Sequence, residues 1–194
     1  MLKLTNLLLI TAIILTGCSI INVHKFSKMY IDAFTLKENT QYAKYTAITV
    51  DTYNSQLNQK LYTTLLSRAT IYTIDFNEDE IDELNQVVNQ FREKVVRIVL
   101  IDANEKNNTA TVKVYISDSY ELLITELKEN VTSDIASEEY RLEIINSLKT
   151  TFKNTKNDDS VETKINIKKD EITGKYYISK QSEEKLIEFI LGLK

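Results

Sequence analysis

The spacing of apolar residues changes near residue 94, and this change constrains the fold more than any other feature. Before it, side chains such as Leu84, Val88 and Phe91 recur every three or four residues, as on one face of a helix. After it, residues 94–101 are apolar at odd and even positions, and residues 110–116 alternate between apolar and polar. We therefore expect two strands in an antiparallel hairpin, the first covered on both faces.

The hairpin pattern returns in the last third of the chain. Residues 161–168 alternate cleanly, residues 170–175 are typical of a turn, and Tyr176–Ile178 predict a short returning strand. Helical patterns cover residues 23–37, 50–69, 77–94, 119–136, 138–154 and 183–191, with a helical turn through Tyr42 and Tyr45. Two hairpins joined by a helical crossover predict an α+β fold, in which one antiparallel sheet of about four strands packs against helices on one side.

The first 17 residues have the layout of an export signal. Lys3 is the only charged residue before His24, and an apolar run follows at residues 7–15. That run is far shorter than the roughly 20 apolar residues that a membrane-spanning helix needs. We therefore interpret residues 1–17 as a signal peptide that is removed.

Leu15, Thr16, Gly17 and Cys18 resemble the lipobox of bacterial lipoproteins, in which an apolar residue, a small residue and Gly or Ala precede a modified cysteine. The resemblance implies a diacylglycerol on the Cys18 thiol and cleavage just before it. A thiol suits this role because a soft nucleophile forms a stable thioether, and two acyl chains anchor a protein firmly. The implied partner is the cell membrane, on its extracytoplasmic face, with a Gram-positive envelope favoured over a Gram-negative one.

A short tether, residues 18–22, would connect this lipid to a single domain of residues 23–194. Five extended residues span at most roughly 15–18 Å, so the domain should lie close to the bilayer. His24, Lys25 and Lys28 come directly after the tether. They would favour contact with anionic lipid, although ordinary solvated residues of a first helix would look the same.

The domain itself resembles a known class of surface protein. The strand TATVKVYI, the helical crossover, and VETKINIKKDEITGKYYI ahead of a short last helix are similar to the NTF2-like (cystatin-like) domains of Gram-positive surface lipoproteins. The resemblance spans residues 22–193 and implies a concave sheet face that encloses a pocket or presents a partner surface. Such domains commonly carry a tryptophan in the last strand, where this chain has Tyr176 or Tyr177.

Tyrosine is the dominant aromatic residue, with 11 copies and no tryptophan in the chain. A cluster in the helical half consists of Tyr30, Tyr42, Tyr45, Tyr53 and Tyr62. These residues could line a cavity between sheet and helices, where the rings stack on a ligand and the hydroxyls orient it. They could equally be half-buried core residues.

The composition argues against several kinds of site. A net charge of −4 without a basic run argues against nucleic acid, and a single cysteine excludes a disulfide within the chain. One histidine at the tether leaves Ser–His or Cys–His catalysis without a base. The acidic residues 75–83 begin like a calcium loop, but Glu80 and Gln86 stand where glycine and a bidentate glutamate are needed. We expect no metal and no cofactor, and interpret this stretch as an acidic helix start.

The hypothesis that fits best is a non-enzymatic module that binds a ligand or a protein while anchored at the cell surface. An enzyme that uses the sheet–helix cavity is one alternative, because folds of this class host some catalysts. A structural or stress protein of the envelope, with no small ligand, is another. Paired carboxylates facing an open cavity would favour the enzyme, and an interface filled by side chains would favour the structural protein.

Overall fold

The computed structural model describes residues 22–37, 41–71, 74–135 and 137–193. The predicted signal peptide, Cys18 and the lipobox lie outside these residues. The helices are α2 (Val23–Phe34), α3 (Tyr42–Tyr45), α4 (Val50–Arg68), α5 (Glu78–Lys94), α6 (Ser119–Asn130), α7 (Glu138–Asn154) and α8 (Lys180–Ile190). The strands are β1 (Ile98–Asn104), β2 (Thr109–Ser117), β3 (Asn157–Lys169) and β4 (Tyr176–Ile178).

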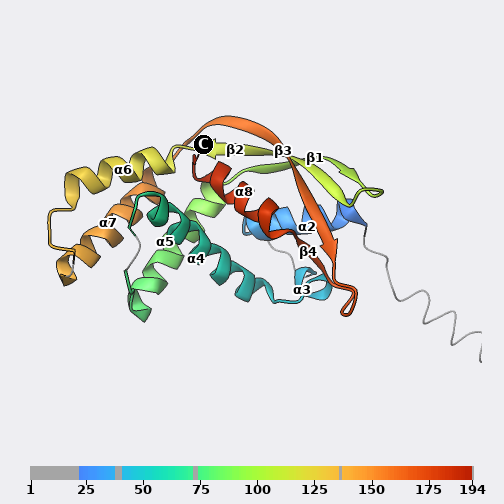
Figure 1. Cartoon of the computed structure of the whole chain (residues 1–194), viewed down its shortest axis with the longest axis horizontal. Coiled ribbons are helices and arrows are strands. Elements are labelled where there is room, and N and C mark those ends of the chain that lie inside the picture. The colour runs from blue at the N-terminus through green and yellow to red at the C-terminus, as the bar shows by residue number, and fades with distance from the viewer. Residues whose placement is uncertain (1–21, 38–40, 72–73, 136, 194) are drawn as a thin grey trace, which may run out of the picture.

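The four strands form one antiparallel sheet in the order β1-β2-β3-β4. Strand β3 pairs with β2 along residues 157–166 and with β4 along residues 167–169, so it joins the two hairpins. Helices α6 and α7 connect β2 to β3 and extend beyond the end of the sheet, whereas α2 and α8 lie beneath it (Figure 1). The predicted α+β class, with two hairpins joined by a helical crossover, is confirmed.

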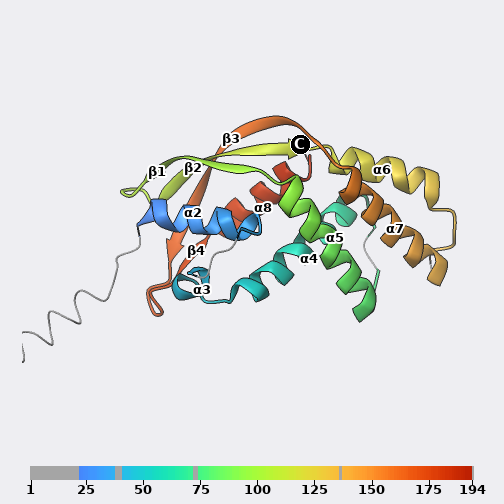
Figure 2. The ribbon, with the colours of Figure 1, turned by 180° about the vertical axis from the view of Figure 1, so that it is seen from behind.

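The inner face of the sheet is the centre of the hydrophobic core. Ala110, Val112 and Val114 of β2 have no exposed surface. The prediction that β1 is covered on both faces is wrong, because Val99 and Ile101 are 44% and 50% exposed. None of the described helices lies over the outer face, which is open in both Figure 1 and Figure 2.

Local capping explains where the helices begin. Asn77 and Glu80 form the predicted capping box at the start of α5, and Ser137 caps α7. Ser179 caps α8, which therefore begins at Lys180 rather than at residue 183. The acidic stretch is thus a helix start, as expected, and Glu80 also pairs with Arg141 of α7 at 2.9 Å.

Two predicted helices are shorter in the structure. Helix α2 ends at Phe34 instead of residue 37, since Leu36 takes a left-handed conformation with φ of 58°. Helix α6 ends at Asn130, and the extended chain that follows places the backbone N–H groups of Thr132 and Ser133 on the Glu143 carboxylate of α7. Neither ending is visible in the spacing of apolar residues.

A buried arginine organises the helical half. Arg92 of α5 has no exposed surface and donates to the carbonyls of Ala33 (2.8 Å) and Phe34 (3.0 Å), which are the last residues of α2. It also donates to the side-chain oxygens of Asn54 (2.9 Å) and Asn58 (2.8 Å) on α4. Its charge therefore meets the negative end of the α2 dipole and two amide oxygens.

Burial lowers the pKa of Arg92 to about 10, so it remains protonated at neutral pH. The other end of α2 is held in a similar way. Glu105, from the turn between β1 and β2, accepts from the backbone N–H groups of Val23 (2.8 Å) and His24 (3.3 Å). Side chains distant in sequence thus satisfy both ends of α2.

Arg92→Met should lower the free energy of unfolding by about 3 kcal/mol or more, because it leaves carbonyl and amide oxygens buried without donors. Arg97→Met is the matched control, since the Arg97 side chain is exposed over the Tyr115 ring, at 5.0 Å. Its effect should stay within about 1 kcal/mol. Urea unfolding of both variants measures the difference, and equal losses would contradict the role assigned to Arg92.

Candidate functional site

The candidate site is a cavity of about 360 Å³ between the helical half and the β3–β4 hairpin, and we call it the tyrosine cavity. Its walls come from α2, α3, the loop after α3, α4, the β3–β4 turn, β4 and α8. The lining residues are Tyr30, Tyr42, Thr46, Ala47, Ile48, Tyr53, Gln56, Leu57, Lys60, Asp170, Thr173, Lys175, Tyr176, Tyr177, Ile178 and Glu183. A volume of this size suits a small organic ligand.

Three tyrosines of the predicted cluster meet at this cavity. The rings of Tyr42 and Tyr53 lie 5.1 Å apart between centroids, and those of Tyr30 and Tyr53 lie 5.9 Å apart. All three are at least 95% buried. Tyr53, Leu57 and Lys60 share one face of α4 because helical spacing places residues four and seven positions apart on the same side.

The other two tyrosines of the cluster lie elsewhere. Tyr62 packs edge-on against Phe76, at 5.9 Å, and lines a separate cavity. Tyr45 lies beneath two lysines: the amino groups of Lys25 and Lys44 are each 5.6 Å from the centroid of its ring. Their spacing in the sequence does not separate them from the three that line the cavity.

Sequence reasoning missed the rest of the lining. The β3–β4 turn and the start of α8 contribute Asp170, Lys175 and Glu183, which lie more than 100 residues after the tyrosines. No motif marks these residues, since a turn and a helix start are polar in most proteins.

Two buried hydroxyls in the cavity wall are the chemical feature of interest. The Oη atoms of Tyr30 and Tyr53 are buried and have no hydrogen-bond partner that meets ordinary geometry. The two groups are near enough to shift each other's pKa. Even if Tyr53 donates to Tyr30, the O–H group of Tyr30 still lacks an acceptor.

Burial raises the pKa of Tyr30, Tyr42 and Tyr53 above the ordinary value of 10.0, and the charge of Glu183 raises each further. All three are therefore neutral hydroxyls at physiological pH. The cavity wall can donate hydrogen bonds to a ligand oxygen, but these phenols are poorly suited to act as bases.

The carboxylates of the lining are already engaged. Glu183 pairs with Lys60 of α4. Asp170 accepts from the backbone N–H of Thr173 (2.7 Å) and of Ile172 (3.1 Å), and the Thr173 bond is the main reason that its pKa is lowered. No group of three or more metal-binding side chains gathers anywhere in the described part of the chain.

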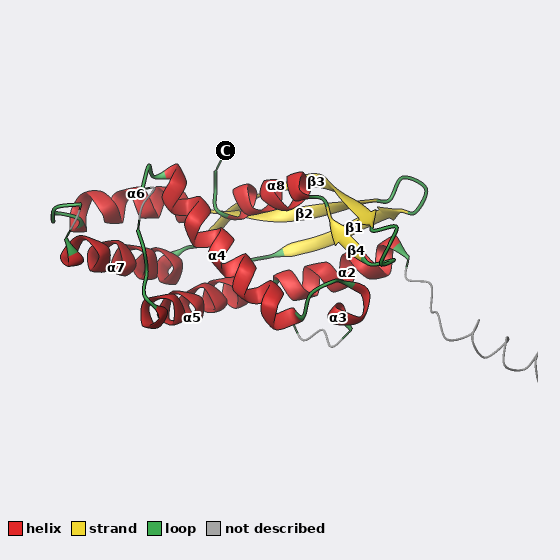
Figure 3. Cartoon of the chain, turned by 60° about the horizontal axis from the view of Figure 1, so that its bottom comes forward, coloured by secondary structure: helices red, strands yellow, loops and turns green. Residues whose placement is uncertain are grey.

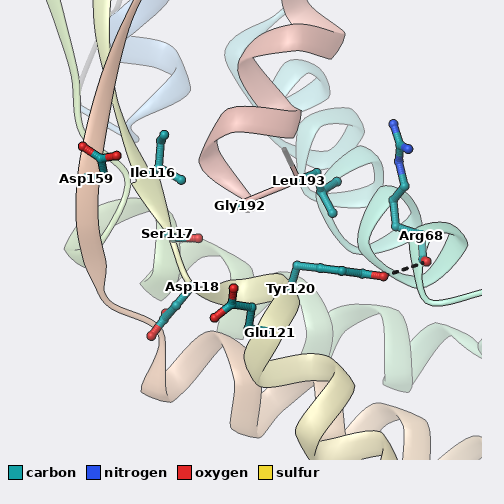
Figure 4. A pocket seen from close by; sticks show the side chains of 9 residues that line it. All are labelled: Arg68, Ile116, Ser117, Asp118, Tyr120, Glu121, Asp159, Gly192 and Leu193. Carbon is teal, nitrogen blue, oxygen red and sulfur yellow. Dashed lines mark hydrogen bonds between the residues drawn. The ribbon is translucent and has the colours of Figure 1, made fainter.

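A second cavity, of about 450 Å³, lies where β2, α6 and the end of α8 meet (Figure 4). It holds three acidic residues, and two of its polar groups serve the junction itself: Asp118 accepts from the Lys156 N–H at 2.8 Å, and the Tyr120 hydroxyl donates to the Arg68 carbonyl at 3.3 Å. Gly192, with φ of 72°, packs so close to the end of β2 that an added Cβ would lie 2.2 Å from the Ser117 carbonyl oxygen. We interpret this cavity as a structural junction.

Comparison with known proteins finds one fold relative. The crystal structure of a candidate lipoprotein, ycdA of Bacillus subtilis, matches 86% of this chain with a TM-score of 0.58 at 15% identity. The chain covers 55% of that protein, so it spans about half its length. No family model matches, and no curated protein matches. At this identity the likeness shows a shared fold.

The described helices include none that is both long and apolar enough to cross a membrane. The hydrophobic surfaces of α2, α4 and α8 instead face the core, through residues such as Phe26, Leu61 and Leu186.

Stability should fall as pH rises above about 10. Below that pH the tyrosines hold their protons in both states, whereas above it the unfolded chain ionises and the folded cavity does not. Each buried tyrosine then costs about 1.4 kcal/mol per pH unit. Urea unfolding across this range should show a shallower fall in a Tyr30→Phe, Tyr53→Phe double variant. Tyr177→Phe, at a position 47% exposed, should behave like the unchanged protein.

Proposed function

We propose that this protein is an extracytoplasmic lipoprotein, anchored through a diacylglycerol on Cys18, whose domain binds a small molecule in the tyrosine cavity without transforming it. The sequence supports the anchor: a complete export-signal layout ends at the lipobox residues Leu15, Thr16, Gly17 and Cys18. The fold shared with the candidate lipoprotein ycdA agrees with this assignment.

The Tyr30 O–H group, which has no acceptor even if Tyr53 donates to its oxygen, is the observation that carries the binding proposal. A buried O–H group without an acceptor costs about 1–3 kcal/mol relative to a satisfied one. Tyr30 lines the cavity, but its Oη atom is itself buried, so a ligand oxygen would recover this energy only when the wall shifts to expose that atom. A polar group without its hydrogen bond, close beneath the wall of a cavity, favours a binding site there.

The lining defines the chemistry of the ligand. Leu57, Ile48 and Ile178 provide an apolar wall, and the tyrosine rings offer faces for stacking. The polar groups are the neutral tyrosine hydroxyls and the Lys60–Glu183 pair. We infer a compact, largely apolar molecule with a carbonyl, ether or hydroxyl oxygen that accepts from the tyrosines.

Binding is favoured over catalysis because the lining lacks a group ready for proton transfer. Asp170 is held by its own turn and Glu183 by Lys60. The tyrosines hold their protons more tightly than free tyrosine does. A general base must be free to take up a proton, and neither these engaged carboxylates nor these buried neutral phenols are suited to that role.

Cys18→Ser should abolish lipidation, because a serine hydroxyl is a far weaker nucleophile than a thiolate. The variant should keep its leader or be cleaved elsewhere, and should lose the mass of the diacylglycerol. Intact-mass spectrometry of membrane and soluble fractions measures this. A variant that still fractionates with membranes at the mature, lipidated mass would refute the anchor.

Ile48→Trp should fill the tyrosine cavity and reduce binding of the neutral, fluorescent, apolar probe N-phenyl-1-naphthylamine by at least about tenfold, since a bulky ring competes for the same space. Ile101→Trp, on the open outer face of the sheet, is the matched control and should bind the probe as the unchanged protein does. Fluorescence titration gives both affinities, and urea unfolding checks that each variant is folded. Equal binding by the two variants would rule out the tyrosine cavity as the site.

A further inference from the structure

One end of the molecule carries three features that are far apart in the sequence. The start of α2, the turn between β1 and β2, and the turn between β3 and β4 all lie at the end of the long axis opposite α6 and α7 (Figures 1 and 3). We call this surface the tether end. Asn22, the first described residue, lies here, and only residues 19–21 separate it from Cys18.

Four lysines gather at the tether end: Lys25, Lys44, Lys169 and Lys175. The amino groups of Lys25 and Lys44 lie over the Tyr45 ring, each at 5.6 Å, and that of Lys169 lies over the Tyr176 ring at 5.5 Å. The Lys175 amino group donates to the Lys44 carbonyl at 2.7 Å, which ties α3 to the β3–β4 turn.

None of these lysines forms a direct ion pair with a carboxylate of the described chain. Six ion pairs within 4.0 Å are formed among the described residues, and none of them includes these four lysines. Of the nearby acids, Glu105 accepts from the start of α2 and Asp170 accepts from its own turn. Glu171 is exposed beside them. All three acids keep their negative charge, so the four lysines outnumber them by one and the tether end is weakly cationic, on a chain whose net charge is −4.

An exposed apolar residue stands at the same end. Ile172, at the tip of the β3–β4 turn, is 95% exposed, the highest value among the exposed large hydrophobic residues. Its turn is fixed, because Asp170 accepts hydrogen bonds from Ile172 and Thr173. An apolar side chain held out at the tip of an ordered turn, with Lys169 and Lys175 at the two ends of that turn, fits the boundary between headgroups and acyl chains.

We propose that the tether end docks the domain on an anionic bilayer, with the lysines at the headgroups and Ile172 entering the acyl boundary. The proposal rests on the anchor at Cys18, because a tether of at most roughly 14 Å from Cys18 to Asn22 keeps this end beside the membrane. Each lysine near such a surface strengthens docking roughly fivefold.

Docking also orients the candidate site. Asp170, Thr173 and Lys175 of the β3–β4 turn line the tyrosine cavity, and Ile172 lies between them in the sequence. Part of the cavity wall therefore lies beside the lipid surface in the docked protein, where a largely apolar ligand is most concentrated.

The lipidated full chain, reconstituted in vesicles, tests the proposal. Ile172→Cys, labelled with bimane, should be quenched by nitroxide-labelled lipid in vesicles containing phosphatidylglycerol, and much less in vesicles of phosphatidylcholine alone. Cys18 is the only native cysteine, and the lipid occupies its thiol, so the label reports one position. Leu142→Cys on α7, 45% exposed at the opposite end, should stay unquenched in both.

Reversing the charge of lysines at the tether end distinguishes docking from the nearness to the membrane that the lipid anchor alone imposes. Lys44→Glu with Lys169→Glu, in the labelled chain, should weaken docking by at least roughly 30-fold. Lys128→Glu with Lys153→Glu, on exposed positions of α6 and α7, changes the net charge equally and should leave the quenching unchanged. A lipidated chain with no quenching at position 172, or with equal quenching in both pairs of variants, overturns docking alone. A chain whose mass shows no lipid overturns the anchor, and docking with it.

Discussion

The Arg92 guanidinium, buried with four oxygen acceptors, is the interaction on which the helical half depends. It joins the end of α2 to the middle of α4 and places both against α5. A buried cation is costly unless its hydrogen bonds are met, and here carbonyl and amide oxygens meet them in place of a carboxylate. This arrangement permits only one relative position of the three helices, because each acceptor comes from a fixed point on its helix.

The position of α2 then determines much of the rest. Helix α2 lies beneath β1, carries Tyr30 into the cavity and begins directly after the residues proposed as the tether. Glu105 holds its first turn to the β1–β2 hairpin, so the start of α2 is connected to the sheet through a charge at a helix N-terminus. Arg92 also lies close enough to Tyr30 to lower the pKa of that phenol slightly against the larger effect of burial. The structural cation and the candidate site thus share one electrostatic environment.

The tyrosine cavity and the tether end meet at the β3–β4 turn. One side of the turn lines the cavity, and its tip presents Ile172 to the surroundings. The proposed ligand site and the proposed membrane surface are therefore neighbours, which is consistent with a protein that collects its ligand at the bilayer. The outer face of the sheet, with Val99 and Ile101 partly exposed, has no such connection to the tether and carries no assigned role.

The sequence alone determined the class of fold and the elements within it. Alternation, helical spacing and capping residues such as Asn77 and Ser137 depend on neighbours within a few positions, so they can be read without tertiary contacts. The sequence also holds the residues that resemble an export signal and a lipobox, on which the proposed anchor depends. The tertiary structure decided which three tyrosines meet, that Arg92 is buried, and that four scattered lysines gather at one end. These facts depend on contacts between segments tens of residues apart, and the spacing of apolar residues within one segment does not indicate which distant segment it contacts.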